Sequence, residues 1–176
     1  MKILHIFEVL KDRLYAAEYD DNKQNILDIL QEQWTDPVFL ELFFEVHKSD
    51  LQSGFFGAIS IEQAIEDTME EADELFDVLY DADEDHLDQL FKSLDNREYK
   101  VIDFQKRKAK GAAKKSWLRI YAVSCNDAYF ITGGAIKLTK EMKERENTKN
   151  ELDKLELMRI LLRANTGEHL FVYLNI

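Results

Sequence analysis

The sequence contains little cysteine, proline or glycine, with one Cys, one Pro and 6 Gly among 176 residues. A single cysteine, Cys125, excludes an intramolecular disulfide framework and any CxxC zinc or redox site, so we expect it to be a small core residue. So few prolines and glycines leave little room for long linkers, and the length is typical of one domain. We therefore expect residues 1–176 to form a single domain.

Long apolar runs are also missing. No stretch approaches the roughly 18 uninterrupted apolar residues that a membrane-spanning helix needs. Glu8 interrupts the short apolar run near the amino terminus, and no small-residue cleavage site follows, which argues against a signal peptide. The sequence predicts a soluble, cytoplasmic protein with no membrane partner.

Catalytic motifs that are recognised by their spacing are absent too. There is no Gly-x-Ser-x-Gly, no P-loop, and no cysteine with an evident histidine partner. The four histidines are scattered, and the acidic run that holds Glu66, Glu70 and Asp77 lacks the Glu-x-x-His motif of a di-iron bundle. We expect no metal and no cofactor, and we interpret the acidic run as a solvated helix face.

Basic residues are scarce in the first half of the chain. Residues 1–96 hold 6 Lys and Arg against 25 Asp and Glu, whereas residues 97–176 hold 17 against 10. The first part has a net charge of −19 and the second a net charge of +7, which together give the chain its −12. Such asymmetry indicates either a polyanion-binding face or an internal acidic counterpart. We distinguish an acidic helical part, residues 22–96, from a basic sheet-and-helix part, residues 97–176.

Helical periodicity dominates the acidic part. Asp36 and Pro37 are typical of an N-cap and a first helical position, and they predict a helix through His47 with Leu42, Phe43 and Val46 facing inward. A preceding helix begins near residue 22, with Ile26, Ile29, Leu30 and Trp34 on one side, and a short helix is expected over residues 85–94. Residues 2–10 and 13–19 either pair as a hairpin or have a helical first segment.

The longest predicted helix begins after Ser60, which forms a capping box with Gln63. Apolar residues then recur at spacings of three and four along one face. That stripe comprises Ile61, Ala64, Ile65, Thr68, Ala72, Leu75, Phe76 and Leu79. The opposite face comprises Glu62, Glu66, Asp67, Glu70, Glu71, Asp73, Glu74 and Asp77.

Near residue 98 the periodicity changes from that of helices to that of strands. We expect strands over residues 99–104, 117–125 and 128–132, with Asn126-Asp127 as the turn between the last two. Gly133-Gly134 then interrupts the strand, either as a bulge or where a ligand backbone comes close.

Beyond the glycines, residues 135–139 continue in extended form. Thr148 and Glu151 form a second capping box at the start of a helix, and residues 171–176 are expected as a final strand. Helices followed by antiparallel strands predict an α+β fold.

A dense basic segment precedes the second of these strands. Seven cations lie within the fourteen residues 106–119. Such a density suits phosphate binding, although a solvated loop has the same composition. Strand alternation places Trp117, Arg119 and Tyr121 on one face, which suits base stacking beside phosphate contact, although either aromatic residue could instead belong to the core. The RNA-binding candidates here are Lys106, Arg107, Lys108, Lys110, Lys114, Lys115 and Trp117.

Residues 97–163 resemble the RelE/ParE toxin superfamily, and most closely its branch of host-growth-inhibiting toxins from type II toxin–antitoxin loci. The motifs that carry the resemblance are Trp117-Leu118-Arg119-Ile120-Tyr121, Tyr129-Phe130-Ile131-Thr132, Gly133-Gly134-Ala135-Ile136-Lys137-Leu138-Thr139, Met142, Thr148 and Glu151-Leu152. The resemblance implies an antiparallel sheet of RelE/ParE-like type in the C-terminal half, with the acidic helices as an N-terminal elaboration.

The resemblance also implies a function. Toxins of this kind cleave messenger RNA, often on the ribosome, and are inhibited by a cognate antitoxin, here expected to be of helix-turn-helix type. Carried onto this sequence, Arg119 and Lys137 would stabilise phosphate charge, Tyr121 or Tyr129 would stack or transfer a proton, and Arg145 would contact RNA. The implied chemistry is metal-free attack of the RNA 2′-OH on the adjacent phosphate. ParE-type members act on gyrase instead, so the fold does not determine the activity.

Two functional hypotheses follow. The first is the toxin component of a type II toxin–antitoxin-like system that targets RNA or the ribosome, with endoribonuclease activity implied by the resemblance. The second is a non-catalytic interaction module whose acidic helices dock a protein partner. The sequence does not determine the oligomeric state.

Overall fold

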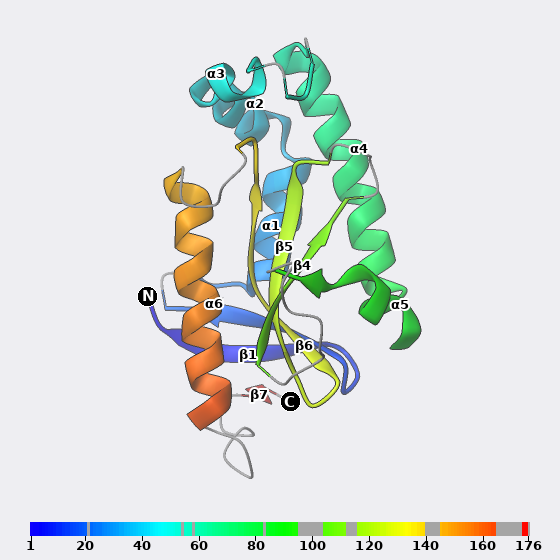
Figure 1. The fold of residues 1–176 in the computed structure, drawn as a ribbon, viewed down its shortest axis with the longest axis vertical. Helices are drawn as coiled ribbons and strands as arrows, with labels where there is room; N and C mark the ends of the chain where they lie inside the picture. The colour runs from blue at the N-terminus through cyan, green and yellow to red at the C-terminus, as the bar shows by residue number, and fades with distance from the viewer. Residues whose placement is uncertain are drawn as a thin grey trace.

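A computed structural model describes residues 1–20, 22–53, 55–57, 59–82, 84–94, 104–111, 116–139, 145–164 and 174–175. The chain has a mixed α+β fold with a mostly antiparallel sheet (Figure 1). The elements in chain order are β1 (Ile3–Leu10), β2 (Leu14–Tyr19), α1 (Ile26–Thr35), α2 (Pro37–Val46), α3 (Lys48–Leu51), α4 (Ile61–Tyr80), α5 (Glu84–Leu90), β3 (Lys92–Ser93), β4 (Gln105–Lys110), β5 (Leu118–Cys125), β6 (Ala128–Ile136), α6 (Glu146–Ala164) and β7 (Leu174–Asn175).

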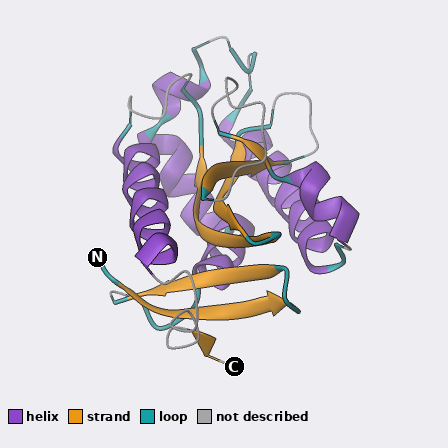
Figure 2. Cartoon of the chain, turned by 60° about the horizontal axis from the view of Figure 1, so that its bottom comes forward, coloured by secondary structure: helices purple, strands orange, loops and turns teal. Residues whose placement is uncertain are grey.

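One sheet joins the two ends of the chain, in the strand order β3-β4-β5-β6-β2-β1-β7. Of the two alternatives for the amino-terminal residues, the structure has the hairpin, since β1 and β2 pair in antiparallel fashion (Figure 2). Strand β2 pairs in parallel with residues 129–131 of β6, and β7 pairs in parallel with β1. The sheet is therefore not confined to the C-terminal half.

Helices cover both faces of β6. A Cβ atom at Gly133 would meet Glu151 of α6, and a Cβ atom at Gly134 would meet Leu30 and Trp34 of α1, so these two helices lie on opposite faces. Helices α1 and α2 both pack against α4, which lies on the other side of the central strands from α6 in Figure 1. None of the described helices is long and apolar enough to cross a membrane.

The start signals of the acidic helices are confirmed. The Asp36 carboxylate accepts a hydrogen bond from the amide of Val38 at 2.9 Å, with Pro37 as the first residue of α2. Ser60 Oγ accepts from the amide of Gln63 at 3.2 Å. The Gln63 side chain donates to Asp67 instead of returning to Ser60, so only half of the predicted capping box forms.

The predicted inward face of α2 is wrong at two of its three positions. Leu42 and Val46 are 65% and 78% exposed, and Phe43 is half-buried, whereas Leu40 and Phe44 are fully buried. Because nearly every residue of this helix is apolar, periodicity alone gives two candidate faces. The stripe of α4 is confirmed, but Glu71 on its predicted solvated face is buried.

The strands of the basic part differ from the prediction in their positions. The turn at Asn126-Asp127 is confirmed, and both residues have positive φ, as a two-residue hairpin turn of type I′ requires. The basic segment from Gln105 to Lys110 is itself the strand β4 and not a loop. The strand expected over residues 99–104 falls outside the described residues except for Phe104, which lies in a turn with a φ of 64°.

Strand β6 passes through both glycines without a break. A bulge does occur, but one residue earlier, because Ala122 pairs with Ile131 and Tyr121 with Gly133, which leaves Thr132 as the extra residue. The second capping box is absent, because α6 begins at Glu146 and the Thr148 hydroxyl donates to the carbonyl of Arg145 at 3.1 Å. Helix α5 ends at Leu90, before the predicted residue 94.

The predicted core cysteine is confirmed, since Cys125 is 4% exposed. Of the final strand expected over residues 171–176, only β7 lies within the described residues.

Candidate functional site

Strand pairing brings several predicted cations to one face of the sheet. In the antiparallel pair β4–β5, Lys110 lies directly opposite Arg119, and Lys108 lies opposite Tyr121. Directly opposed residues point to the same side of a sheet, so Lys108, Lys110 and Arg119 share the α6 side with Tyr121 and Lys106. We call Lys106, Lys108, Lys110 and Arg119 the cationic face.

The pair of Lys110 and Arg119 is unfavourable for stability, because like charges directly opposite each other in adjacent strands repel. Lys110 is exposed. Nη1 of Arg119 donates to the carbonyls of Ser116 and Leu118 at 2.9 and 2.6 Å. Arg119 is half-buried, and burial lowers the pKa of its guanidinium, while Tyr121 and Glu71 oppose that shift.

The other two cations of this face are half-buried and held by contacts within the protein. Lys106 Nζ lies 2.9 Å from Glu156 of α6, and Lys108 Nζ donates to the carbonyl of Leu94 at 3.3 Å. Hydrogen bonding from Lys106 lowers the pKa of the Glu156 carboxyl. Lys110 is therefore the exposed charge of the cationic face, and Arg119 opposite it is half-buried like Lys106 and Lys108.

Lys137 directly follows β6, the strand that pairs with the Arg119 strand β5. The Lys137 amide donates to the carbonyl of Trp117 at 2.8 Å, which extends the β5–β6 pairing by one residue. Arg119 pairs with Ala135, which lies two residues before Lys137. Nζ of Lys137 donates to the carbonyl of Thr139 at 2.7 Å.

The two tyrosines that the sequence groups together lie on opposite faces. Tyr121 is 1% exposed, and burial raises the pKa of its hydroxyl, which has no hydrogen-bond partner among the described residues. Tyr129 faces α5, where its hydroxyl donates to Asp88 at 2.9 Å and its ring stacks on Phe91. Burial and then Asp88 raise the pKa of Tyr129 to about 12.

Two further RNA-binding candidates, Arg107 and Trp117, are not on the cationic face. Arg107 is buried on the Tyr129 side, where its Nε donates to Ser124 at 3.4 Å. Trp117 precedes β5, and its buried indole donates to Thr68 of α4 at 2.9 Å, so it does not share the face of Arg119 and Tyr121.

Arg145 pairs with Asp50 at the end of α3 through two hydrogen bonds, and this pairing lowers the pKa of Asp50. Lys114 and Lys115 lie outside the described residues.

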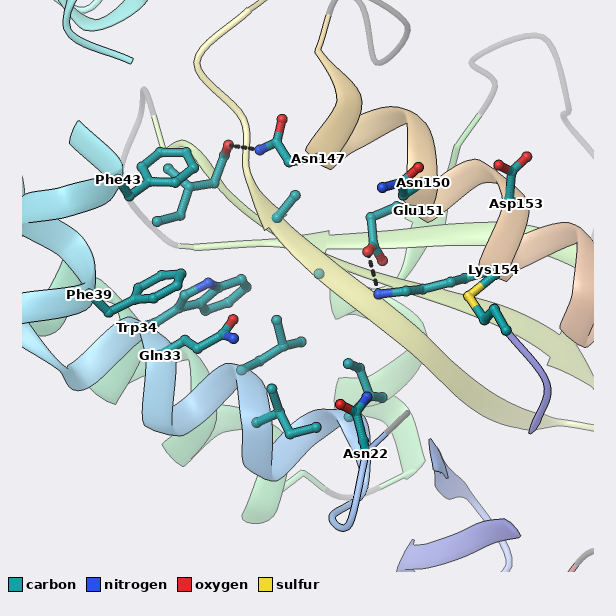
Figure 3. Close-up of a pocket in the computed structure, with 17 residues that line it drawn as sticks. Asn22, Gln33, Trp34, Phe39, Phe43, Asn147, Asn150, Glu151, Asp153 and Lys154 are labelled. Carbon is teal, nitrogen blue, oxygen red and sulfur yellow. Dashed lines mark hydrogen bonds and ion pairs between the residues drawn. The ribbon is translucent and has the colours of Figure 1, made fainter. Parts of the chain in front are cut away.

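A second site was not predicted from the sequence. A cleft of about 610 Å³ lies between α1 and α6, with residues 134–136 of β6 at its base (Figure 3). Glu151 lies in its polar wall and forms a salt bridge of 2.6 Å with Lys154. Burial raises the pKa of Glu151 to about 7, although Lys154 opposes the shift. Glu151 Oε2 has no hydrogen-bond partner among the described residues.

The two consecutive glycines, Gly133 and Gly134, are the feature of the sequence from which this cleft could have been predicted. The Glu151 carboxylate lies against Gly133 and α1 lies against Gly134, so each glycine permits the close approach of a helix. The sequence offered a bulge or a ligand as the reason for these glycines, and side chains of the protein itself occupy both places. No group of His, Cys, Asp and Glu that could hold a metal ion occurs in the described ranges.

Comparison of the chain with protein-family models, with curated proteins and with solved structures found no match.

Proposed function

We propose that this protein is the RNA-targeting, growth-inhibiting toxin component of a type II toxin–antitoxin-like system, and that it contacts RNA through the cationic face. The observation that carries the proposal is the pairing of Lys110 with Arg119. Two like charges opposed in neighbouring strands repel each other, and the nearby charge of Glu71 offsets only the part that acts on Arg119. A phosphate group between them would convert the repulsion into attraction. Messenger RNA or the ribosome and a cognate antitoxin are the proposed partners.

Cleavage of the bound RNA would need a proton acceptor as well as cations. The raised pKa values of Tyr121 and Tyr129 keep both hydroxyls protonated at neutral pH, and Tyr121 is fully buried. Arg119 and Lys137 can stabilise charge on phosphate but are poor bases. The proposal therefore assigns RNA contact to this face, and the integrity of the RNA is a separate outcome of the experiment.

Fluorescence anisotropy with a labelled single-stranded RNA of about 16 nucleotides tests this contact. Lys110→Gln and Arg119→Gln should each weaken binding about threefold to tenfold at about 150 mM salt, and each should reduce the salt slope by about one. Glutamine at position 119 removes the charge that faces RNA and leaves a polar side chain in its place.

Lys11→Gln is the matched control, because Lys11 is exposed in the β1–β2 turn and its replacement changes the net charge equally. Equal losses in all three variants would mean that only net charge matters. That result, or an absence of salt-dependent binding by the wild-type protein, would contradict the proposal.

A second candidate, a non-catalytic module that docks a protein through its helical part, is favoured by α2. Val38, Leu42 and Val46 recur every fourth residue and are 63%, 65% and 78% exposed. This alternative predicts a protein partner whose capture is lost in Leu42→Asp/Val46→Asp, with RNA affinity unchanged. Capture that survives the double substitution would argue against it.

A further inference from the structure

Strand β6 extends beyond the end of its pairing with β2, so one edge of its second half is open. Its pairing with β2 ends at Ile131, and no described strand pairs with residues 132–136 on that side. The carbonyls of Thr132 and Ile136 face this open edge, where they accept hydrogen bonds from the Tyr19 hydroxyl and the Asn147 amide at 2.7 and 3.4 Å. Alternation along the strand directs the N–H and C=O of Gly134 to the same edge.

The cleft at this edge has two unlike walls (Figure 3). Side chains of an added strand would alternate between the two faces of the sheet, so every second side chain would meet each wall. The volume of about 610 Å³ is within the range of ligand sites. The apolar wall comprises Ile26, Ile29, Leu30, Trp34, Phe39 and Phe43, and the polar wall comprises Asn147, Asn150, Glu151, Asp153 and Lys154.

The polar wall favours a hydrogen-bond donor that carries positive charge. Glu151 is 3% exposed, with its Oε1 held by Lys154 and its Oε2 against Gly133, so the exposed carboxylate of this wall is that of Asp153. The Lys154 ammonium is held by Glu151 Oε1 and lies 5.6 Å from the centre of the Tyr19 ring. Asp153 adds a second, exposed carboxylate to the same wall.

We propose that this cleft binds an extended peptide segment of a partner protein, with aliphatic residues alternating with basic ones, as an additional strand on β6. The residue opposite Gly134 is aliphatic and points to Leu30 and Trp34, because opposed residues share a face. Its two neighbours are basic and point to the α6 side, where Asp153 is the exposed carboxylate. Main-chain hydrogen bonds supply affinity and the two walls supply specificity. The site is separate from the cationic face and does not rest on the proposed function.

The probe is the synthetic peptide acetyl-Leu-Lys-Leu-Lys-Leu-amide, compared with the same peptide N-methylated on its central leucine. Both peptides have the same charge, but N-methylation removes the donor that pairs with Gly134. In a titration followed by amide NMR, the unmodified peptide should saturate and shift the Gly134 amide signal. The N-methylated peptide should bind at least about tenfold more weakly.

A pair of charge reversals tests the polar wall. Asp153→Lys should weaken binding of the unmodified peptide several-fold, whereas Asp73→Lys, an equal charge change at an exposed position of α4, should leave it within about twofold. Equal binding of the two peptides, or equal losses in the two variants, would show non-specific attraction to an acidic protein and overturn the proposal. Absence of saturation by the unmodified peptide would overturn it as well.

Discussion

Replacing Gly134 by alanine is expected to lower the free energy of unfolding by about 2–3 kcal/mol. The new Cβ atom would lie 2.7 Å from Leu30 Cδ1, 2.8 Å from the carbonyl oxygen of Arg119 and 3.0 Å from the Trp34 ring. Leu30 can change its rotamer, but the Arg119 carbonyl belongs to the neighbouring strand, and Trp34 is 2% exposed in the core. The clash must therefore be relieved by moving backbone.

Urea unfolding, monitored by tryptophan fluorescence, measures this loss in the free energy of unfolding. Gly133→Ala is the variant for comparison. A Cβ atom at Gly133 meets the Glu151 carboxylate, which is a side chain that can be removed. Addition of Glu151→Ala should therefore restore part of the stability lost in Gly133→Ala and none of that lost in Gly134→Ala. A Gly134→Ala variant as stable as the wild type would show that α1 does not pack against the strand as closely as described.

Glu151→Gln is expected to remove one pH-dependent contribution to the free energy of unfolding. The folded protein holds the Glu151 proton more tightly than the unfolded chain, because burial raises the pKa of this carboxyl to about 7 from 4.5. The folded state therefore binds more protons between those two pH values, and the contribution of Glu151 to stability falls as the pH rises through that window. The full shift corresponds to about 3 kcal/mol as an upper limit.

Unfolding free energies at pH 5 and pH 8 test this sign. The free energy of unfolding of Glu151→Gln, minus that of the wild type, should rise by about 2 kcal/mol from pH 5 to pH 8. Glu156→Gln is the control on the same helix, because Lys106 lowers the pKa of Glu156 and its contribution is lost only on acidification. An unchanged difference between Glu151→Gln and wild type at the two pH values would mean that Glu151 is not buried as described.

Local sequence signals predicted the elements whose cause is local. The caps at Asp36 and Ser60, the stripe of α4 and the turn at Asn126-Asp127 each depend on residues within one or two turns of chain. The face of α2 could not be predicted in this way. Its residues are apolar on most sides, and the choice between Leu40 and Leu42 depends on where α4 and Trp117 lie.

The candidate site was predicted in part, for a similar reason. Composition predicts where the cations lie in the sequence. Arg107 lies on the opposite face of the sheet from Lys106 and Lys108 because β4 is a strand. That strand was not predicted, since basic residues are weak strand formers. The spacing of Glu151 from Thr148 fits a capping box, so the sequence predicts an exposed capping residue. Its burial arises from the close approach of α6 to Gly133, which is a tertiary contact.

Induced expression in a bacterial host, with growth and messenger RNA integrity measured together, tests whether the protein is an RNA-targeting toxin. We expect the wild-type protein and Lys11→Gln to arrest growth, and Lys110→Gln/Arg119→Gln to relieve the arrest while remaining folded. Loss of intact messenger RNA during the arrest would indicate that the bound RNA is also cleaved. Normal growth on expression of the wild-type protein, or an arrest that the double substitution leaves unchanged, would show that the cationic face does not inhibit growth by binding RNA.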